Sequence, residues 1–221
     1  MPGKRDARPE RQSSWLSSLA EVRRKLDAWL GPLELCFSAF VLWHFSVQAY
    51  RAASDGALPE PGFERAPELV SALFLLLWLP FTLLGLRRAG RAFTAAPLPA
   101  VNAQERALAT IEPVALGVVL LFGTVHGAQM AWPLLSGTLT EIDLRPELVA
   151  GLSSTWRGVP LSAIVYLCAV GAASFYAARR TLAALPVGRI GLSRAVVGVA
   201  VLAYLLGSYA VIRCGSGSLL P

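Results

Sequence analysis

Apolar residues in this sequence gather in five long runs that short polar segments separate. The runs cover positions 33–50, 69–86, 114–135, 161–178 and 191–212. A helix needs about 20 apolar residues to cross a hydrocarbon core of about 30 Å, because each residue rises about 1.5 Å. The short alternating segments of a membrane barrel are absent from the sequence. The pattern therefore predicts an all-α integral membrane bundle of five transmembrane helices.

Composition agrees with a membrane protein. The chain of 221 residues is 55% hydrophobic and only 15% charged, and its mean hydropathy is +0.54. Soluble domains carry about 25% charged residues, so the charge deficit argues against a soluble domain of this length. We expect a basic cytoplasmic N-terminal segment (1–30), a five-helix transmembrane domain (31–213) and a short outer tail (214–221). Within the first segment, residues 15–30 form a candidate amphipathic helix on the membrane surface.

The net charge of +6 predicts orientation in the membrane and does not predict nucleic acid as a partner. Lys and Arg are concentrated before the first apolar run and in the segments 87–106 and 179–189, whereas the other two loops are rich in Asp and Glu. Lys and Arg are retained on the cytoplasmic side of membrane proteins. The sequence thus predicts a multi-pass protein of the cell's inner (cytoplasmic) membrane, with a cytoplasmic N-terminus and the C-terminus outside.

Prolines stand at or near the start of four of the five runs. Proline suits the first position of a helix, because its missing N–H would be unpaired there in any case. We therefore expect helices to begin at Pro32, Pro67, Pro113 and Pro160.

The two histidines of the chain fall at matching depths in this scheme. His44 and His126 lie 12 and 13 residues after the prolines of their runs, which is about 18 and 20 Å along a helix. Both side chains are then expected in the outer half of the membrane, where ionisable groups are costly and usually functional. Two imidazoles that face each other across a bundle can hold a haem iron from both sides, an arrangement suited to electron transfer.

A structural role for the two histidines stays open at this point. Membrane histidines also form hydrogen bonds between helices. The small residues beside them, among them Ser46, Gly123, Thr124 and Gly127, would leave space for a macrocycle but would equally allow close helix packing.

Three stretches resemble a known family: Leu42-Trp43-His44-Phe45, the segment 79–94, and the segment 108–132 that leads through His126. They resemble the five-helix cytochrome b membrane anchor of succinate dehydrogenase and quinol:fumarate reductase. The resemblance implies a subunit that docks an iron–sulfur subunit and a flavoprotein subunit on its cytoplasmic face. It also implies menaquinone or ubiquinone as a bound substrate in the membrane lipid. The dicarboxylate chemistry would belong to the partner subunits.

The sequence departs from this family at two positions. The family pattern has a histidine on each of the first four helices, which together hold two haems. The second-helix and fourth-helix positions fall here on Leu84 and Tyr176. The resemblance therefore implies at most one haem b, at the outer site, with His44 and His126 as its axial ligands. A chain without haem remains an alternative, as does a non-redox membrane protein such as a small transporter or a scaffold.

Two further groups of residues have simple structural interpretations. Glu34 and Glu112 lie close to the prolines of the first and third runs, where a carboxylate would favour a helix N-terminus. Proton transfer is the alternative role for them. Most tryptophans, Trp78 among them, are expected to lie in the aromatic belts of the membrane interface.

Overall fold

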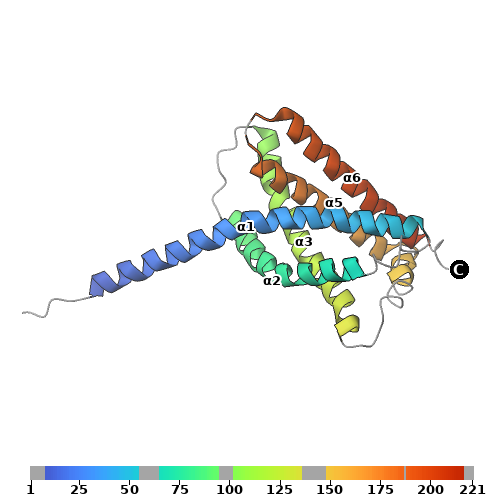
Figure 1. Ribbon diagram of the computed structural model, residues 1–221, viewed down its shortest axis with the longest axis horizontal. Coiled ribbons are helices and arrows are strands. Elements are labelled where there is room, and N and C mark those ends of the chain that lie inside the picture. Colours follow the sequence, from blue (N-terminus) through green and yellow to red (C-terminus); the bar gives the residue numbers. More distant parts are fainter. Residues whose placement is uncertain (1–7, 55–64, 95–101, 136–147, 187, 217–221) are drawn as a thin grey trace, which may run out of the picture.

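The computed structural model describes residues 8–54, 65–94, 102–135, 148–186 and 188–216. Five long helices account for most of them (Figure 1): α1 (Arg8–Ala53), α2 (Arg65–Thr94), α3 (Ala103–Leu135), α5 (Leu161–Ala184) and α6 (Ile190–Gly215). A short helical segment at 148–153 precedes α5. Within these ranges the only β-type pairing is an isolated bridge between Trp156 and Val159. The prediction of an all-helical chain is confirmed.

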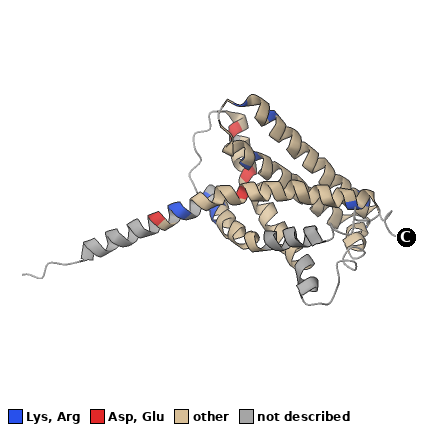
Figure 2. Ribbon diagram, in the orientation of Figure 1, with Lys and Arg blue, Asp and Glu red and all other residues tan. Residues whose placement is uncertain are grey.

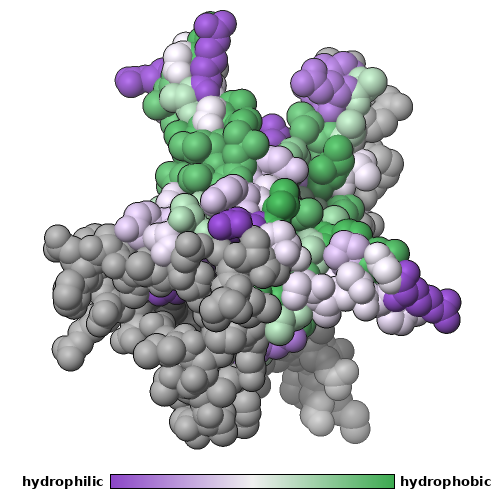
Figure 3. All heavy atoms as spheres, turned by 90° about the vertical axis from the view of Figure 1, so that its right-hand side faces the viewer, coloured by the Kyte–Doolittle hydropathy of each residue, from purple (hydrophilic) through white to green (hydrophobic). Residues whose placement is uncertain are grey.

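Four helical segments are long and apolar enough to cross a membrane: Ala28–Ala53, Ala103–Gln129, Leu161–Ala184 and Ile190–Gly215. Large apolar side chains are exposed on them, as is usual for surfaces that contact lipid. Figure 3 shows hydrophobic residues below hydrophilic tips on the upper part of one face. The second predicted span lies within α2, where the side chains of residues 65–75 fall outside the described part of the chain. The fifth span and the orientation therefore stay predictions.

Two of the four helices begin at or beside the expected proline, and two do not. Pro32 lies inside α1 and Pro113 lies inside α3, while Pro67 is in the first turn of α2 and Pro160 directly precedes Leu161 of α5. Membrane helices tolerate an internal proline because neighbouring groups satisfy the backbone that it leaves unpaired. The predicted surface helix at 15–30 is the N-terminal part of α1, which projects beyond the other helices (Figure 1).

The bundle core joins four helices. α1 packs against α2, α5 and α6, and α3 packs against α2 and α5, so α1 and α3 lie across the bundle from each other. The main hydrophobic core contains buried residues from α1, α2, α3 and α5: Phe37, Val41, Phe81, Ala89, Leu116, Val119, Leu120, Tyr176 and Ala177. On the opposite face of α1, Gly207 lets α6 approach closely, because a Cβ atom there would lie 2.8 Å from Val170 and 3.0 Å from Phe45.

Candidate functional site

A buried carboxylate lies at one end of the four-helix core. The side chain of Glu34 in α1 is only 2% exposed, and a buried charge is costly unless other groups compensate it. Glu34 has three donors, each at 2.6 Å: Arg88 Nη1 and Tyr176 Oη donate to its Oε1, and Arg180 Nε donates to its Oε2. These donors come from α2 and α5, so Glu34 ties three helices together.

Glu112 of α3 extends this network. Arg88 Nη2 and Arg180 Nη1 donate to its Oε1 at 3.3 and 3.2 Å, and Arg179 Nη2 lies 3.6 Å from its Oε2. Arg88 and Arg180 thus each bridge the carboxylates of Glu34 and Glu112. We call these five residues the ion-pair cluster; it connects α1, α2, α3 and α5 near the point where α1 enters the bundle (Figure 2).

The prediction that Glu34 and Glu112 favour helix N-termini is wrong. Both residues lie inside helices, well beyond the first turn, and their carboxylates pair with arginines from other helices. The physical reason is that both carboxylates lie among packed helices and away from a helix end. A carboxylate in a low-dielectric bundle is stabilised far more by direct cation partners than by a helix dipole whose effect fades within one turn.

Tyr176, which stands where a second haem ligand would be expected, belongs to this end of the bundle. Its side chain is fully buried, its hydroxyl donates to Glu34, and its ring packs edge-on against Phe37 and Phe81. Phe81 lies on α2 one turn before Leu84. Aromatic packing and ion pairs therefore fill the region around Tyr176.

The second polar region contains the two histidines. His126 Nδ1 lies 3.0 Å from the hydroxyl of Tyr166 on α5, and Phe122, one turn earlier on α3, stacks on the imidazole with ring centroids 5.3 Å apart. His44 has a matching neighbour, because Phe40 lies one turn earlier on α1 and stacks on it at 5.4 Å. Each imidazole is thus oriented by a phenylalanine four residues before it.

The ion-pair cluster gives a common origin for measuring depth. His44 lies ten residues after Glu34 on α1, and Tyr166 lies ten residues before Tyr176 on α5. Since Glu34 and Tyr176 are hydrogen-bonded, both ten-residue steps lead about 15 Å along the bundle in the same direction. Tyr166 in turn contacts His126. His44, Tyr166 and His126 therefore lie toward the same end of the bundle, and we call these three residues the histidine layer.

The space beside His126 is partly filled. The indole of Trp78 lies directly over Gly123 and leaves no room for a Cβ atom there, and its Nε1 donates to Thr124 Oγ1 at 3.2 Å. Trp78 also packs against the main hydrophobic core, so the prediction that it lies in an interfacial belt is wrong. On this side of α3, the small residues allow close packing between helices.

The donor chemistry of the histidine layer fits a haem. A histidine that binds a metal usually donates its other ring N–H to a nearby acceptor, which fixes the tautomer. In the tautomer in which Nδ1–H of His126 donates to Tyr166, Nε2 would carry the lone pair that an iron takes. His44 lies on α1 and His126 on α3, and both helices pack against α2 and α5.

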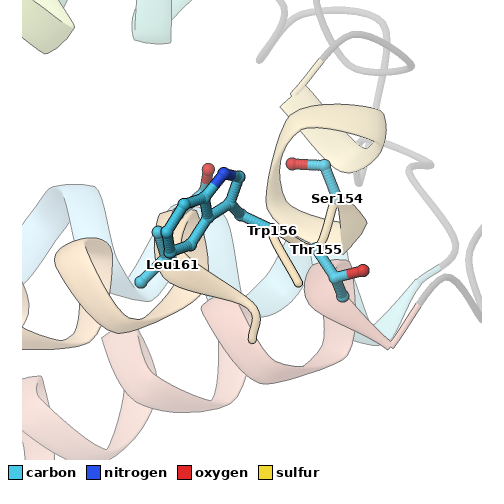
Figure 4. A pocket seen from close by; sticks show the side chains of 5 residues that line it. Ser154, Thr155, Trp156 and Leu161 are labelled. Carbon is cyan, nitrogen blue, oxygen red and sulfur yellow. The ribbon is translucent and has the colours of Figure 1, made fainter. Parts of the chain in front are cut away.

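A separate open pocket lies at the start of α5. Trp156 and Leu161 line one side, and Ser154 and Thr155 line the other (Figure 4), with Ser162 completing a space of about 360 Å³. It contains neither histidine and no member of the ion-pair cluster. This pocket is therefore distinct from both buried polar regions.

Comparison with protein-family models, curated proteins and solved structures finds no match for this chain. The case for a function therefore rests on the residues themselves. Sequence reasoning selected His44, His126 and Tyr176 but missed Tyr166 and the arginine partners of Glu34. Glutamates at the start of two apolar runs, with arginines just after the ends of two others, could have indicated the ion-pair cluster.

Proposed function

We propose that this chain is the membrane anchor subunit of a succinate:quinone oxidoreductase, with one haem b held between His44 and His126. The hydrogen bond between His126 and Tyr166, toward the same end of the bundle as His44, is the observation that carries the proposal. The resemblance of residues 42–45 and 108–132 to the family indicates the class of complex to which the chain would belong. The orientation that we propose, with the arginine-rich end in the cytoplasm, follows from the sorting of Lys and Arg.

Each residue of the histidine layer has a specific role in this proposal. His44 and His126 would hold the iron through one ring nitrogen each, Phe40 and Phe122 would orient the two imidazole rings, and Tyr166 would fix the tautomer of His126. A haem with two axial imidazoles supplies one-electron transfer and leaves no open position for other ligands. The protein's contribution is to position the haem and exclude water, while the haem and a quinone carry the electrons.

In this proposal the ion-pair cluster takes the place of the second haem of the family. Arg88, Arg180 and Tyr176 surround Glu34 at the end of the bundle where the family places its inner haem. Since that region is packed with ion pairs and aromatic rings, we propose that it holds the helices together in the absence of an inner cofactor. Electrons from an iron–sulfur partner would then pass to quinone without an inner haem.

Subunit composition tests the proposed function. The tagged chain, extracted in mild detergent from its native membrane, should copurify with an iron–sulfur protein and a flavoprotein. Photocrosslinkers placed in the segments 87–106 and 179–189 should capture the iron–sulfur protein, whereas one after Pro221 should not. Recovery of the chain alone, under conditions that preserve other respiratory complexes, would contradict the proposal.

A non-redox membrane protein is the second candidate, and the hydrogen bond between His126 and Tyr166 favours it. This contact is the kind of helix-to-helix link that a purely structural histidine makes. The candidate predicts that the purified chain has no haem absorption and that His126→Gln, which keeps a polar group at this position, leaves its stability nearly unchanged.

A further inference from the structure

We infer that Arg179 and Arg88 form a binding site for the phosphate of an anionic phospholipid. The ion-pair cluster carries a net positive charge. The ion-pair cluster holds three arginines and two glutamates, so one positive charge has no acidic partner within it. An uncompensated cation at membrane depth is costly, and an anion that binds beside it removes this cost.

Arg179 is the arginine that the cluster satisfies least. Its contact with Glu112 is 3.6 Å, the longest in the ion-pair cluster, and its buried Nε has no hydrogen-bond partner in the described part of the chain. Its side chain is nevertheless 37% exposed, and that of Arg88 is 33% exposed. The guanidinium of Arg179 therefore offers an outward edge to a ligand. A guanidinium can pair two of its N–H donors with phosphate oxygens.

The position of Arg179 favours a lipid over a soluble partner. Arg179 lies five residues before Ala184, the last residue of α5, which is about 7.5 Å inside the helix end. Under the proposed orientation this part of α5 lies at the level of the lipid headgroups, near the end of a segment long and apolar enough to cross a membrane. The cytoplasmic leaflet is also rich in anionic lipids, which basic residues near the helix ends attract. This inference requires a membrane protein but does not depend on haem.

Native mass spectrometry of the purified full-length chain tests the site. Phosphatidylglycerol is titrated onto the wild type and onto the variants R179Q and R194Q. Arg194 is an exposed arginine of α6, four residues after that helix begins, so R194Q makes the same charge change outside the ion-pair cluster. We expect R179Q to weaken phosphatidylglycerol binding about tenfold, because one charge-assisted contact is lost, and R194Q to leave it unchanged. R179K, which keeps the charge but lacks the Nε–H donor, should have an intermediate affinity.

Three outcomes would overturn the inference. Equal effects of R179Q and R194Q would mean that only the overall charge matters. Displacement of the lipid by inorganic phosphate at equal concentration would mark a site for free phosphate. Protection of Arg179 from chemical modification by a soluble protein partner, and not by phosphatidylglycerol, would assign the surface to protein docking. Thermal unfolding of each variant shows that loss of binding does not reflect loss of fold.

Discussion

The hydroxyl of Tyr176 donates a 2.6 Å hydrogen bond to Oε1 of Glu34, and this contact joins α5 to α1 in the buried end of the bundle. Glu34 is thereby an acceptor for a neutral donor and for two arginines at once. Because hydrogen bonds to charged groups are the strong ones, this contact should stabilise the bundle measurably.

Removal of the Tyr176 hydroxyl tests that contact. Tyr176→Phe keeps the ring packed against Phe37 and Phe81 and removes only the donor. We expect a loss of about 2 kcal/mol in the free energy of unfolding, the usual contribution of a hydrogen bond to a charged group. Tyr209→Phe, at a tyrosine of α6 that is 43% exposed, serves as the control and should change stability little. Equal effects of the two variants, measured by unfolding in the same detergent, would contradict the assignment.

Neutralisation of Glu34 should be more damaging. Glu34→Gln leaves Arg88 and Arg180 without their shared charge partner, and breaking one side of a buried pair costs about 3 kcal/mol or more. Glu21→Gln removes an exposed carboxylate that pairs with Arg24 on the same helix, which should cost less than about 1 kcal/mol. In a double-mutant cycle, Glu34→Gln combined with Arg180→Gln should cost less than the sum of the single variants. Strict additivity would show that the two side chains do not interact.

Two glycines of α3 give a matched test of packing beside the histidine layer. A Cβ atom at Gly123 would overlap the indole of Trp78, whereas a Cβ atom at Gly117 would meet nothing within 4 Å. Gly123→Ala should therefore destabilise the bundle by about 1–3 kcal/mol, the range for an overpacked core. Gly117→Ala should be neutral or stabilise it by up to about 1 kcal/mol, because alanine favours a helix over glycine. If thermal unfolding shows that Gly117→Ala destabilises the bundle more than Gly123→Ala does, Trp78 does not pack over Gly123.

Reporter fusions test the five-span topology, which the four described spans leave as a prediction. The sided distribution of Lys and Arg predicts that a reporter in the segment 95–103 is cytoplasmic and that one after Pro221 is outside. Alkaline phosphatase, active outside, and a fluorescent protein, active inside, should give opposite results at the two sites. If both reporters are found in the same compartment, the prediction of five spans is wrong.

Part of this structure could be predicted from the sequence, because helix formation and membrane insertion depend on local composition. The apolar runs predict the cores of α1, α2, α3, α5 and α6. The ends of the helices could not be predicted from prolines, since neighbouring helices can satisfy the backbone that an internal proline disrupts. The ion-pair cluster was missed because Glu34 and Arg180 are far apart in sequence and meet only through helix packing.

The role of Tyr166 was also missed, for a related reason. Nothing in the order of residues on α5 indicates that this hydroxyl faces His126 on α3. Only the antiparallel packing of the two helices brings them together. If His126 binds a haem, Tyr166→Phe should keep the haem but alter its reduction potential, because the hydrogen bond tunes the basicity of the ligand. Redox titration followed at the α-band measures this shift, and an unchanged potential would remove Tyr166 from the proposed site.

The most direct test of the proposed function is the haem content of the purified chain, measured by pyridine haemochrome absorbance per mole of protein. We predict one b-type haem, low-spin because two imidazoles fill both axial positions. His44→Ala and His126→Ala should each abolish it, whereas Tyr176→Phe should leave the spectrum unchanged. Two haems per chain would mean that a second ligand pair lies outside the histidine layer. No haem in an intact, quinone-reducing complex would contradict the account and leave the two histidines as structural contacts between helices.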